Sequence, residues 1–231
     1  MTVITINGQI GTGGPEIAAE LARRLGFDYV DRLILAEAAL RLGATVEALA
    51  EKEQRTPSRG ERIARFLQTL MERSAAAGAG GDPYFGPGLG VLLGQDYTEV
   101  MREPITRADQ LKDDHFIEAT QSVIQELANS GNTIINGRAS NLILRDRPDA
   151  FHVGLVSSSM ESRINVIANR LGVPPEEAER IVNEHEKARV AYFRKFFKAS
   201  AEDPSKFHIM LDTHRLDRDR VAAIIINAAD L

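Results

Sequence analysis

The sequence contains no cysteine among its 231 residues. This absence excludes a disulfide framework, a zinc site with thiolate ligands and a cysteine nucleophile. A chain without cysteine also suits a reducing compartment, where disulfides do not persist. The five histidines show neither the H-x-x-x-H nor the H-E-x-x-H spacing, so we assign no metal-ligating residues.

The sequence also lacks a long apolar run. One of the longest uncharged apolar stretches, Val221 to Ala229, falls well short of the ~20 residues that a membrane-spanning helix needs. The first six residues lack the basic segment that opens a signal peptide. We therefore expect a cytoplasmic protein with no membrane partner.

An excess of positive charge is absent as well. Lysine and arginine number 28 against 33 aspartate and glutamate residues, a formal charge of −5, which disfavours nucleic acid as a partner. Hydrophobic residues make up 43% and charged residues 26%, as in ordinary globular proteins. This composition excludes collagen-like, low-complexity and fully disordered chains.

Short apolar runs alternate along the sequence with segments of helical periodicity. Strands are expected at residues 3–7, 27–30, 133–136, 151–156 and 209–212. Helices are expected at 15–25, 33–54 (two, broken at Gly43), 61–77, 112–130, 141–144, 159–171, 175–197 and 217–229. Because the strands are almost wholly apolar and alternate with helices, we predict an α/β protein whose parallel sheet is covered on both faces.

A glycine-rich segment interrupts this alternation. Residues 78–94 contain seven glycines and two prolines. Loops of this length in a compact domain are usually functional, so we expect a mobile functional loop there.

A second glycine-rich segment joins the first expected strand to the first expected helix. It carries Gly8, Gly11, Thr12, Gly13 and Gly14, and we assign these five residues to cofactor binding. Glycines let backbone N–H groups converge on an anion, and a helix N-terminus adds its dipole. The spacing fits the start of the phosphate-binding pattern G-x-x-x-x-G-K-[ST], but Gly14 replaces its lysine and Pro15 its hydroxyl residue. A tight strand-to-helix turn without a ligand is the alternative.

Several segments together resemble the cytidylate kinase-like family, a branch of the P-loop nucleoside monophosphate kinases. The resemblance is carried, in order, by residues 8–16, 29–32, 131–138, 144–146 and 189–192. It covers nearly the whole chain. In that branch the loop commonly reads G-S-G-G-[RK], so Gly14 is a family trait, whereas Pro15 departs from it.

The resemblance implies a P-loop NTPase-type three-layer fold with a five-stranded parallel sheet of order 2-3-1-4-5. It implies one domain over residues 1–231, with a core at 1–55 and 112–231. A helical insertion at 56–111 would bind the acceptor, and residues 174–206 would form a lid. The same resemblance implies that ATP and Mg²⁺ are the cofactors.

Arg138 lies just after the third expected strand, in the segment Asn136-Gly137-Arg138. The similar D-G-R-D segment of cytidylate kinases places its arginine on the acceptor phosphate, and a guanidinium binds a phosphate bidentately. Both flanking acids are absent here, because Asn136 and Ala139 take their places. The alternative is a surface or helix-capping arginine.

Asp31 and Arg32 follow the second expected strand. The carboxylate could position an acceptor hydroxyl or a metal-bound water, and Arg32 could contact a phosphate. A helix N-cap is an equally good interpretation of Asp31.

The expected helix at 175–197 is basic towards its end. Residues 187–198 hold five cations and no acid, interleaved with four aromatic residues. In the resembling kinases this region is the lid, whose arginines neutralise the transferring phosphoryl group, and Glu186 with Arg189 matches their D-x-x-R spacing. We assign Arg189 to catalysis, and Glu186 and Arg194 to the acceptor and lid region. An amphipathic helix with packed aromatics is the alternative.

The sequence predicts phosphoryl transfer from ATP-Mg to a small acceptor such as a nucleoside monophosphate, with Arg138, Arg189 and Asp31 as catalytic residues. Two rival hypotheses stay open. One is a degenerate kinase fold that binds nucleotide or a partner without turnover, and the other is a docking surface for RNA or protein on the basic helix. A homo-oligomer stays open too.

Overall fold

The computed structural model of the chain describes residues 2–31, 38 and 113–231. The chain divides into two compact units, Met1–Asp31 with Ile124–Leu231, and Arg32–Val123. Most of the second unit lies outside the described residues, including Arg32, the expected helices at 33–54 and 61–77, and the glycine-rich segment 78–94. The single domain and the acceptor-binding insertion therefore stay predictions.

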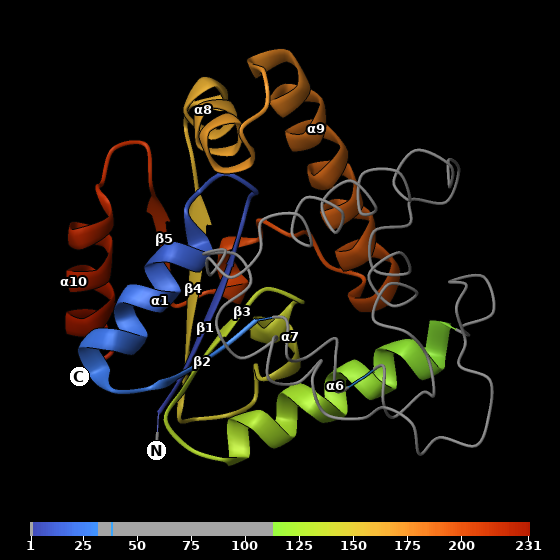
Figure 1. The fold of residues 1–231 in the computed structure, drawn as a ribbon. Helices are drawn as coiled ribbons and strands as arrows, with labels where there is room; N and C mark the ends of the chain where they lie inside the picture. Colours follow the sequence, from blue (N-terminus) through green and yellow to red (C-terminus); the bar gives the residue numbers. More distant parts are fainter. Residues whose placement is uncertain (1, 32–37, 39–112) are drawn as a thin grey trace, which may run out of the picture. The chain divides into compact units, whose positions relative to one another are not determined.

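A five-stranded parallel sheet forms the centre of the first unit (Figure 1). Its strands are β1 (Val3–Gly8), β2 (Asp28–Val30), β3 (Thr133–Asn136), β4 (Ala150–Val156) and β5 (Ile209–Asp212). All the pairings are parallel and the order is β2-β3-β1-β4-β5. The predicted α/β class and strand order are confirmed.

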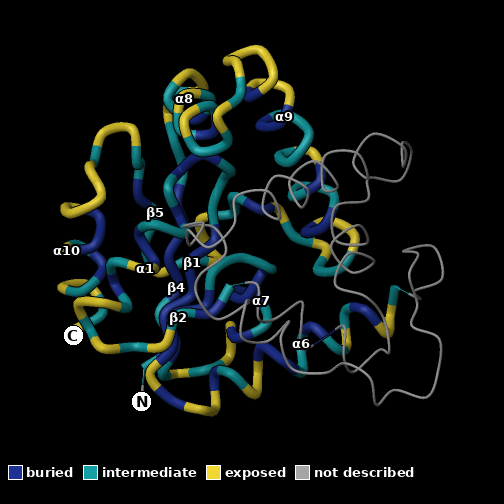
Figure 2. The backbone as a smooth tube through the Cα atoms, in the orientation of Figure 1, coloured by how far each residue is buried: buried dark blue, intermediate teal, exposed yellow. Residues whose placement is uncertain are grey.

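One face of the sheet carries an apolar core. Ile4 and Ile6 of β1 are fully buried there. Helices α1 (Gly14–Leu25) and α10 (Arg218–Ala228) cover this face, and they bury Leu21 and Ile225 against it (Figures 1 and 2). Burying such a side chain stabilises the fold by roughly 1.5–3 kcal/mol, so this face anchors the sheet.

The opposite face of β1 is polar although it is equally buried. Thr5 and Asn7 point there, and Asn7 Nδ2 donates to Ser140 Oγ at 3.1 Å. Ser140 opens the short helix α7 (Ser140–Ile143), so helices lie on both faces, as the three-layer prediction requires. Thr5 Oγ1 lies 2.8 Å from Nδ1 of His152 on β4, and each polar side chain thereby has a partner.

The remaining helices begin within one residue of their predicted starts, and two of the three end within one residue of their predicted ends. They are α6 (Asp113–Asn129), α8 (Met160–Leu171) and α9 (Pro175–Tyr192). Ser159 caps α8 by accepting from the N–H of Ser162, and Gly172 ends it in a left-handed conformation. The predicted helix at 175–197 changes at its end to a π-helical turn, η3 (Phe193–Phe197), and a short 3₁₀ turn, η4 (Pro204–Lys206), precedes β5. No helix among the described residues is long and apolar enough to cross a membrane.

Candidate functional site

The predicted site residues gather at the carboxyl edge of the sheet. The glycine loop follows β1, Asp31 follows β2, and Arg138 follows β3. Because the strands are parallel, these segments leave the sheet at the same edge, where ligands bind in open α/β folds. The topology therefore brings together residues that are more than 100 positions apart in the sequence.

The glycine loop is shaped by close backbone contacts. A Cβ atom on Gly8 would lie 2.6 Å from the carbonyl oxygen of Leu155, and one on Gly11 would lie 2.6 Å from that of Arg163. Gly11 also has a positive φ of 84°. Neither position accepts a side chain without moving backbone, so glycine is required at both.

The loop presents N–H groups that have no partner within the described residues. These belong to Ile10, Gly11, Gly13, Gly14 and Glu16. Helix α1 begins at Gly14, so they lie at or just before its N-terminus. Unpaired N–H groups and the helix dipole favour an anion at this point. The loop thus has the geometry of a phosphate-binding turn.

Thr12 supports the loop from inside. Its side chain is buried, and its hydroxyl donates to the carbonyl oxygen of Gln9 at 2.7 Å. The N–H of Thr12 donates to the same oxygen at 3.3 Å. Thr12 therefore closes the turn, and its assignment to cofactor binding stays a prediction.

Asp31 and Arg138 form a partly buried ion pair. Arg138 Nη1 donates to Asp31 Oδ1 at 2.7 Å and to the Asp31 carbonyl oxygen at 3.0 Å. Tyr29 and Asn136 also donate to the Asp31 carboxylate, at 3.3 and 3.4 Å. The carboxylate holds the guanidinium at the strand end with a charge-assisted contact.

The turn that carries Arg138 is strained. Gly137, Arg138 and Ala139 adopt positive φ values of 84°, 55° and 53° in succession. A non-glycine residue in this region costs about 1–2 kcal/mol, and such strain clusters at functional sites. The strain is thus consistent with a binding role for Arg138.

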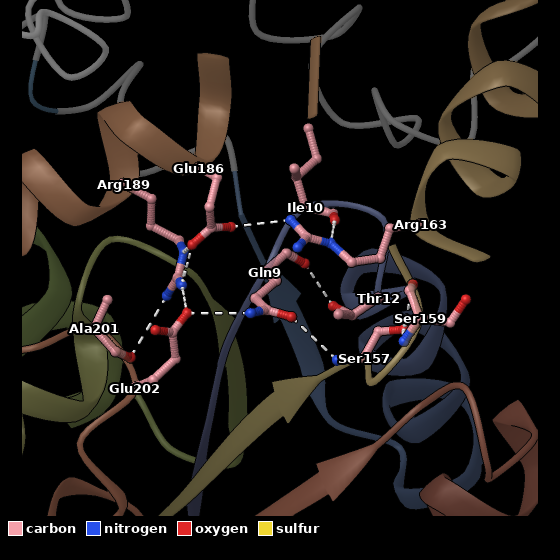
Figure 3. Close-up of polar contacts among 10 residues, drawn as sticks. All are labelled: Gln9, Ile10, Thr12, Ser157, Ser159, Arg163, Glu186, Arg189, Ala201 and Glu202. Carbon is pink, nitrogen blue, oxygen red and sulfur yellow. Dashed lines mark hydrogen bonds and ion pairs between the residues drawn. The ribbon is translucent and has the colours of Figure 1, made fainter. Parts of the chain in front are cut away.

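Arg189 lies in an ionic network beside the glycine loop (Figure 3). Arg189 on α9 pairs with Glu186, at 3.1 Å from Nε to Oε1, and with Glu202. Glu186 also accepts from Arg163 of α8 at 3.0 Å. Arg163 Nε donates to the carbonyl oxygen of Ile10 at 2.8 Å, so the network is anchored directly on the loop.

Arg163 is the most deeply buried cation of the network, with 5% of its surface exposed. Its burial lowers the pKa of its guanidinium, and the nearby Glu186 carboxylate opposes that shift. With two arginines facing two carboxylates, the network is close to neutral as it stands.

Arg194 is exposed on η3, away from these contacts. Tyr192 and Phe193 are buried and pack edge-on at 6.3 Å between ring centroids, as the amphipathic interpretation of the basic helix predicts. Packing accounts for these two aromatic residues. The lid role of Arg194 stays a prediction.

Three residues of the site were not assigned from the sequence: Gln9, Arg163 and Glu202. Gln9 lies within the glycine loop, but the loop pattern assigns a role only to the four glycines and Thr12. Arg163 is one of several arginines on amphipathic helices, and Glu202 follows the basic helix without any motif. Their roles depend on packing between distant segments, which no local pattern records.

Magnesium was implied by the resemblance. Within residues 2–31, 38 and 113–231, no group of three or more histidine, aspartate or glutamate side chains could hold a metal ion. Mg²⁺ usually keeps several waters and uses one or two carboxylates with substrate phosphates. Asn136 lies between the Asp31 carboxylate and the glycine loop. Its Nδ2 donates to Asp31, and its Oδ1 lies 3.4 Å from the point where a Cβ on Gly14 would stand. The residues present fit an ion held mainly by phosphate and water.

The sheet order and the glycine loop between its central strand and first helix define a P-loop α/β protein. Residues 3–215 match the Cytidylate kinase-like family, and the chain belongs to that family. A cytidylate kinase from Methanopyrus kandleri is 26% identical over 113 residues, which are 46% of this chain and 58% of that protein.

One solved structure shares the fold, and a second is more loosely similar. An uncharacterized protein from Eubacterium ventriosum superposes with a TM-score of 0.63 at 16% identity, over 100% of this chain and 99% of that one. A shikimate kinase from Bacteroides thetaiotaomicron has a TM-score of 0.47 at 11% identity, over 100% and 99% of the two chains. The first likeness supports the fold, and the second is too loose to carry an inference.

Proposed function

We propose that the protein transfers the γ-phosphoryl group of ATP to a small acceptor such as a nucleoside monophosphate. The observation that carries this proposal is the glycine loop, whose unpaired N–H groups lie at the N-terminus of α1. Membership of the Cytidylate kinase-like family supports it. Phosphoryl transfer needs positioning and charge stabilisation rather than a covalent nucleophile, and this site offers backbone donors and arginines.

The donor phosphates would bind to the loop. The N–H groups of Ile10, Gly11, Gly13, Gly14 and Glu16 would supply hydrogen bonds, and Arg189 would stabilise charge on the transferred group. When bound, Mg²⁺ would neutralise charge on the phosphates, with Asp31 and Asn136 holding its waters.

The acceptor phosphate would bind to Arg138. Its guanidinium is already oriented by Asp31 at 2.7 Å, so little side-chain freedom would be lost on binding. Asp31 would therefore act as a positioning residue for Arg138. Nucleotides are the partners that this arrangement suits, and a cytoplasmic location and a homo-oligomer stay predictions.

An assay of ADP release with ATP-Mg and a panel of monophosphates tests the proposal. We expect Arg138→Ala to lower kcat/KM for the acceptor by roughly 100-fold, the scale of one lost hydrogen-bonded contact to a charged group, with ATP affinity nearly unchanged. Arg145→Ala is the matched control, because Arg145 is an exposed arginine a few residues further along the chain. An equal loss of ATP and acceptor binding in Arg138→Ala would refute the assignment of Arg138.

A catalytically degenerate nucleotide-binding protein is the second candidate. It is favoured by Gly14 and Pro15 at the positions of lysine and hydroxyl residue, and by the pairing of Arg163 and Arg189 with carboxylates. ATP binding without ADP release for any acceptor would select it over the kinase.

A further inference from the structure

Glu202 joins the end of the basic helix to the glycine loop. Its carboxylate accepts from the Arg189 guanidinium and from Gln9 Nε2, the latter at 3.2 Å (Figure 3). Arg189 also donates to the carbonyl oxygen of Ala201 at 3.5 Å. One carboxylate thus occupies two donors, one on the loop and one on α9.

The side chain of Gln9 is held in a single orientation. The N–H of Ser157, just after β4, donates to Gln9 Oε1 at 3.1 Å. Because this donor fixes the amide oxygen, it also fixes the side of the amide on which the NH₂ group lies. That NH₂ group faces Glu202. Gln9 is therefore a preorganised donor beside the loop.

The two carboxylates on Arg189 differ in how firmly they are held. Glu186 lies on the same helix as Arg189, is also bonded to buried Arg163, and leaves 21% of its side chain exposed. Glu202 lies in the segment before η4 and leaves 39% of its side chain exposed. Of the two, Glu202 is the one that can leave for water at little cost in packing.

Carboxylate and phosphate oxygens have the same acceptor chemistry towards guanidinium and amide donors. A phosphate brought to Arg189 while both carboxylates remain would meet two negative charges, and like charges at a few ångströms repel strongly in a part-buried site. Departure of Glu202 removes one of them and releases both donors together.

We propose that Gln9 and Arg189 form a phosphate-binding subsite, and that Glu202 fills it as an internal anion which the substrate must displace. The inference rests on the proposed function, since it concerns the same loop. Glu202 thereby opposes phosphate binding in the resting protein, and Gln9 is a further binding residue of the site.

Calorimetric titration with inorganic tripolyphosphate, and separately with ATP-Mg, tests the proposal on the full chain. We expect Glu202→Gln to tighten tripolyphosphate binding roughly tenfold, the scale of one charge-assisted contact, and Gln9→Glu to weaken it. Glu184→Gln is the matched control, because it removes the same charge from α9 at a carboxylate paired with Arg180. It should change the affinity less than twofold.

Weaker tripolyphosphate binding in Glu202→Gln would overturn the proposal, because Glu202 would then position Arg189 instead of competing with the ligand. An unchanged affinity, or no binding by any variant, would overturn it as well. Failure of the proposed function has a different signature: tripolyphosphate binding would still tighten in Glu202→Gln, while no acceptor would give ADP release. Far-UV circular dichroism of each variant separates these outcomes from misfolding.

Discussion

His152 makes the stability of the fold depend on pH. His152 lies on β4 and only 4% of the residue is exposed. Its Nδ1 lies 2.8 Å from Thr5 Oγ1, and its ring stacks on that of His208 with 5.0 Å between the ring centroids. Burial lowers the pKa of His152 to about 4 from its ordinary 6.5, with a smaller contribution from His208, while a backbone group of Leu144 acts in the opposite direction. The folded protein therefore holds this ring neutral.

The direction of the effect follows from that lowered pKa. Below pH 6.5 the unfolded chain binds a proton at His152 that the folded chain does not, so stability falls as the pH falls from about 6.5 to about 4. The full shift corresponds to about 3 kcal/mol, and between pH 7.5 and pH 4.5 the expected loss is about 2.5 kcal/mol. Above pH 6.5 the contribution is constant.

Urea unfolding followed by circular dichroism at both pH values measures this loss. Because carboxylates titrate in the same range, the relevant quantity is the difference between the wild type and His152→Gln, which keeps an acceptor for Thr5 but cannot be protonated. We expect the variant to lose about 2.5 kcal/mol less stability on acidification. His214→Gln, at an exposed histidine, is the matched control substitution. Parallel curves for wild type and His152→Gln would refute the reasoning.

The remaining predictions concern the loop and its support. Gly11→Ala should lower the free energy of unfolding by about 2 kcal/mol or more, because its Cβ would lie 2.6 Å from a backbone carbonyl oxygen. Gly26 also has a positive φ, but a Cβ there would have no atom within 4 Å, so Gly26→Ala should cost about 1 kcal/mol. Equal losses of stability for the two variants in urea unfolding would contradict this. Arg163→Met should cost about 2 kcal/mol, since it leaves the Ile10 carbonyl oxygen without its donor and removes one of the two arginines that pair with Glu186. Arg180→Met on the exposed face should cost under about 0.5 kcal/mol, and a comparable effect of the two in thermal unfolding would show that burial of Arg163 is unimportant.

The sequence predicted most of the fold of the first unit. Strands such as β3 and β5 were found at their observed bounds, because apolar runs in a buried parallel sheet leave an unmistakable pattern. Helix ends were found through Pro175 and Gly26, which restrict the backbone locally. The strand order came from the family resemblance, since periodicity does not specify which strands are neighbours.

The site was predicted less completely. Glycine spacing located the loop and strand ends located Asp31 and Arg138, because these features are local. Gln9 and Glu202 are joined by a hydrogen bond between segments 193 residues apart, and Arg163 becomes important only because α8 packs on the loop. Such contacts depend on tertiary packing, and one sequence carries no signal for them.

The central claim is that the glycine loop binds a triphosphate through its backbone N–H groups. Titration of ¹⁵N-labelled protein with ATP-Mg, followed by amide NMR, measures this directly. The account predicts that the largest shift changes fall on Ile10, Gly11, Gly13, Gly14 and Glu16, with smaller changes on Thr12, whose N–H is already bonded to Gln9. Saturation at millimolar ATP with no shift at the first five amides, or no binding at all, would contradict it.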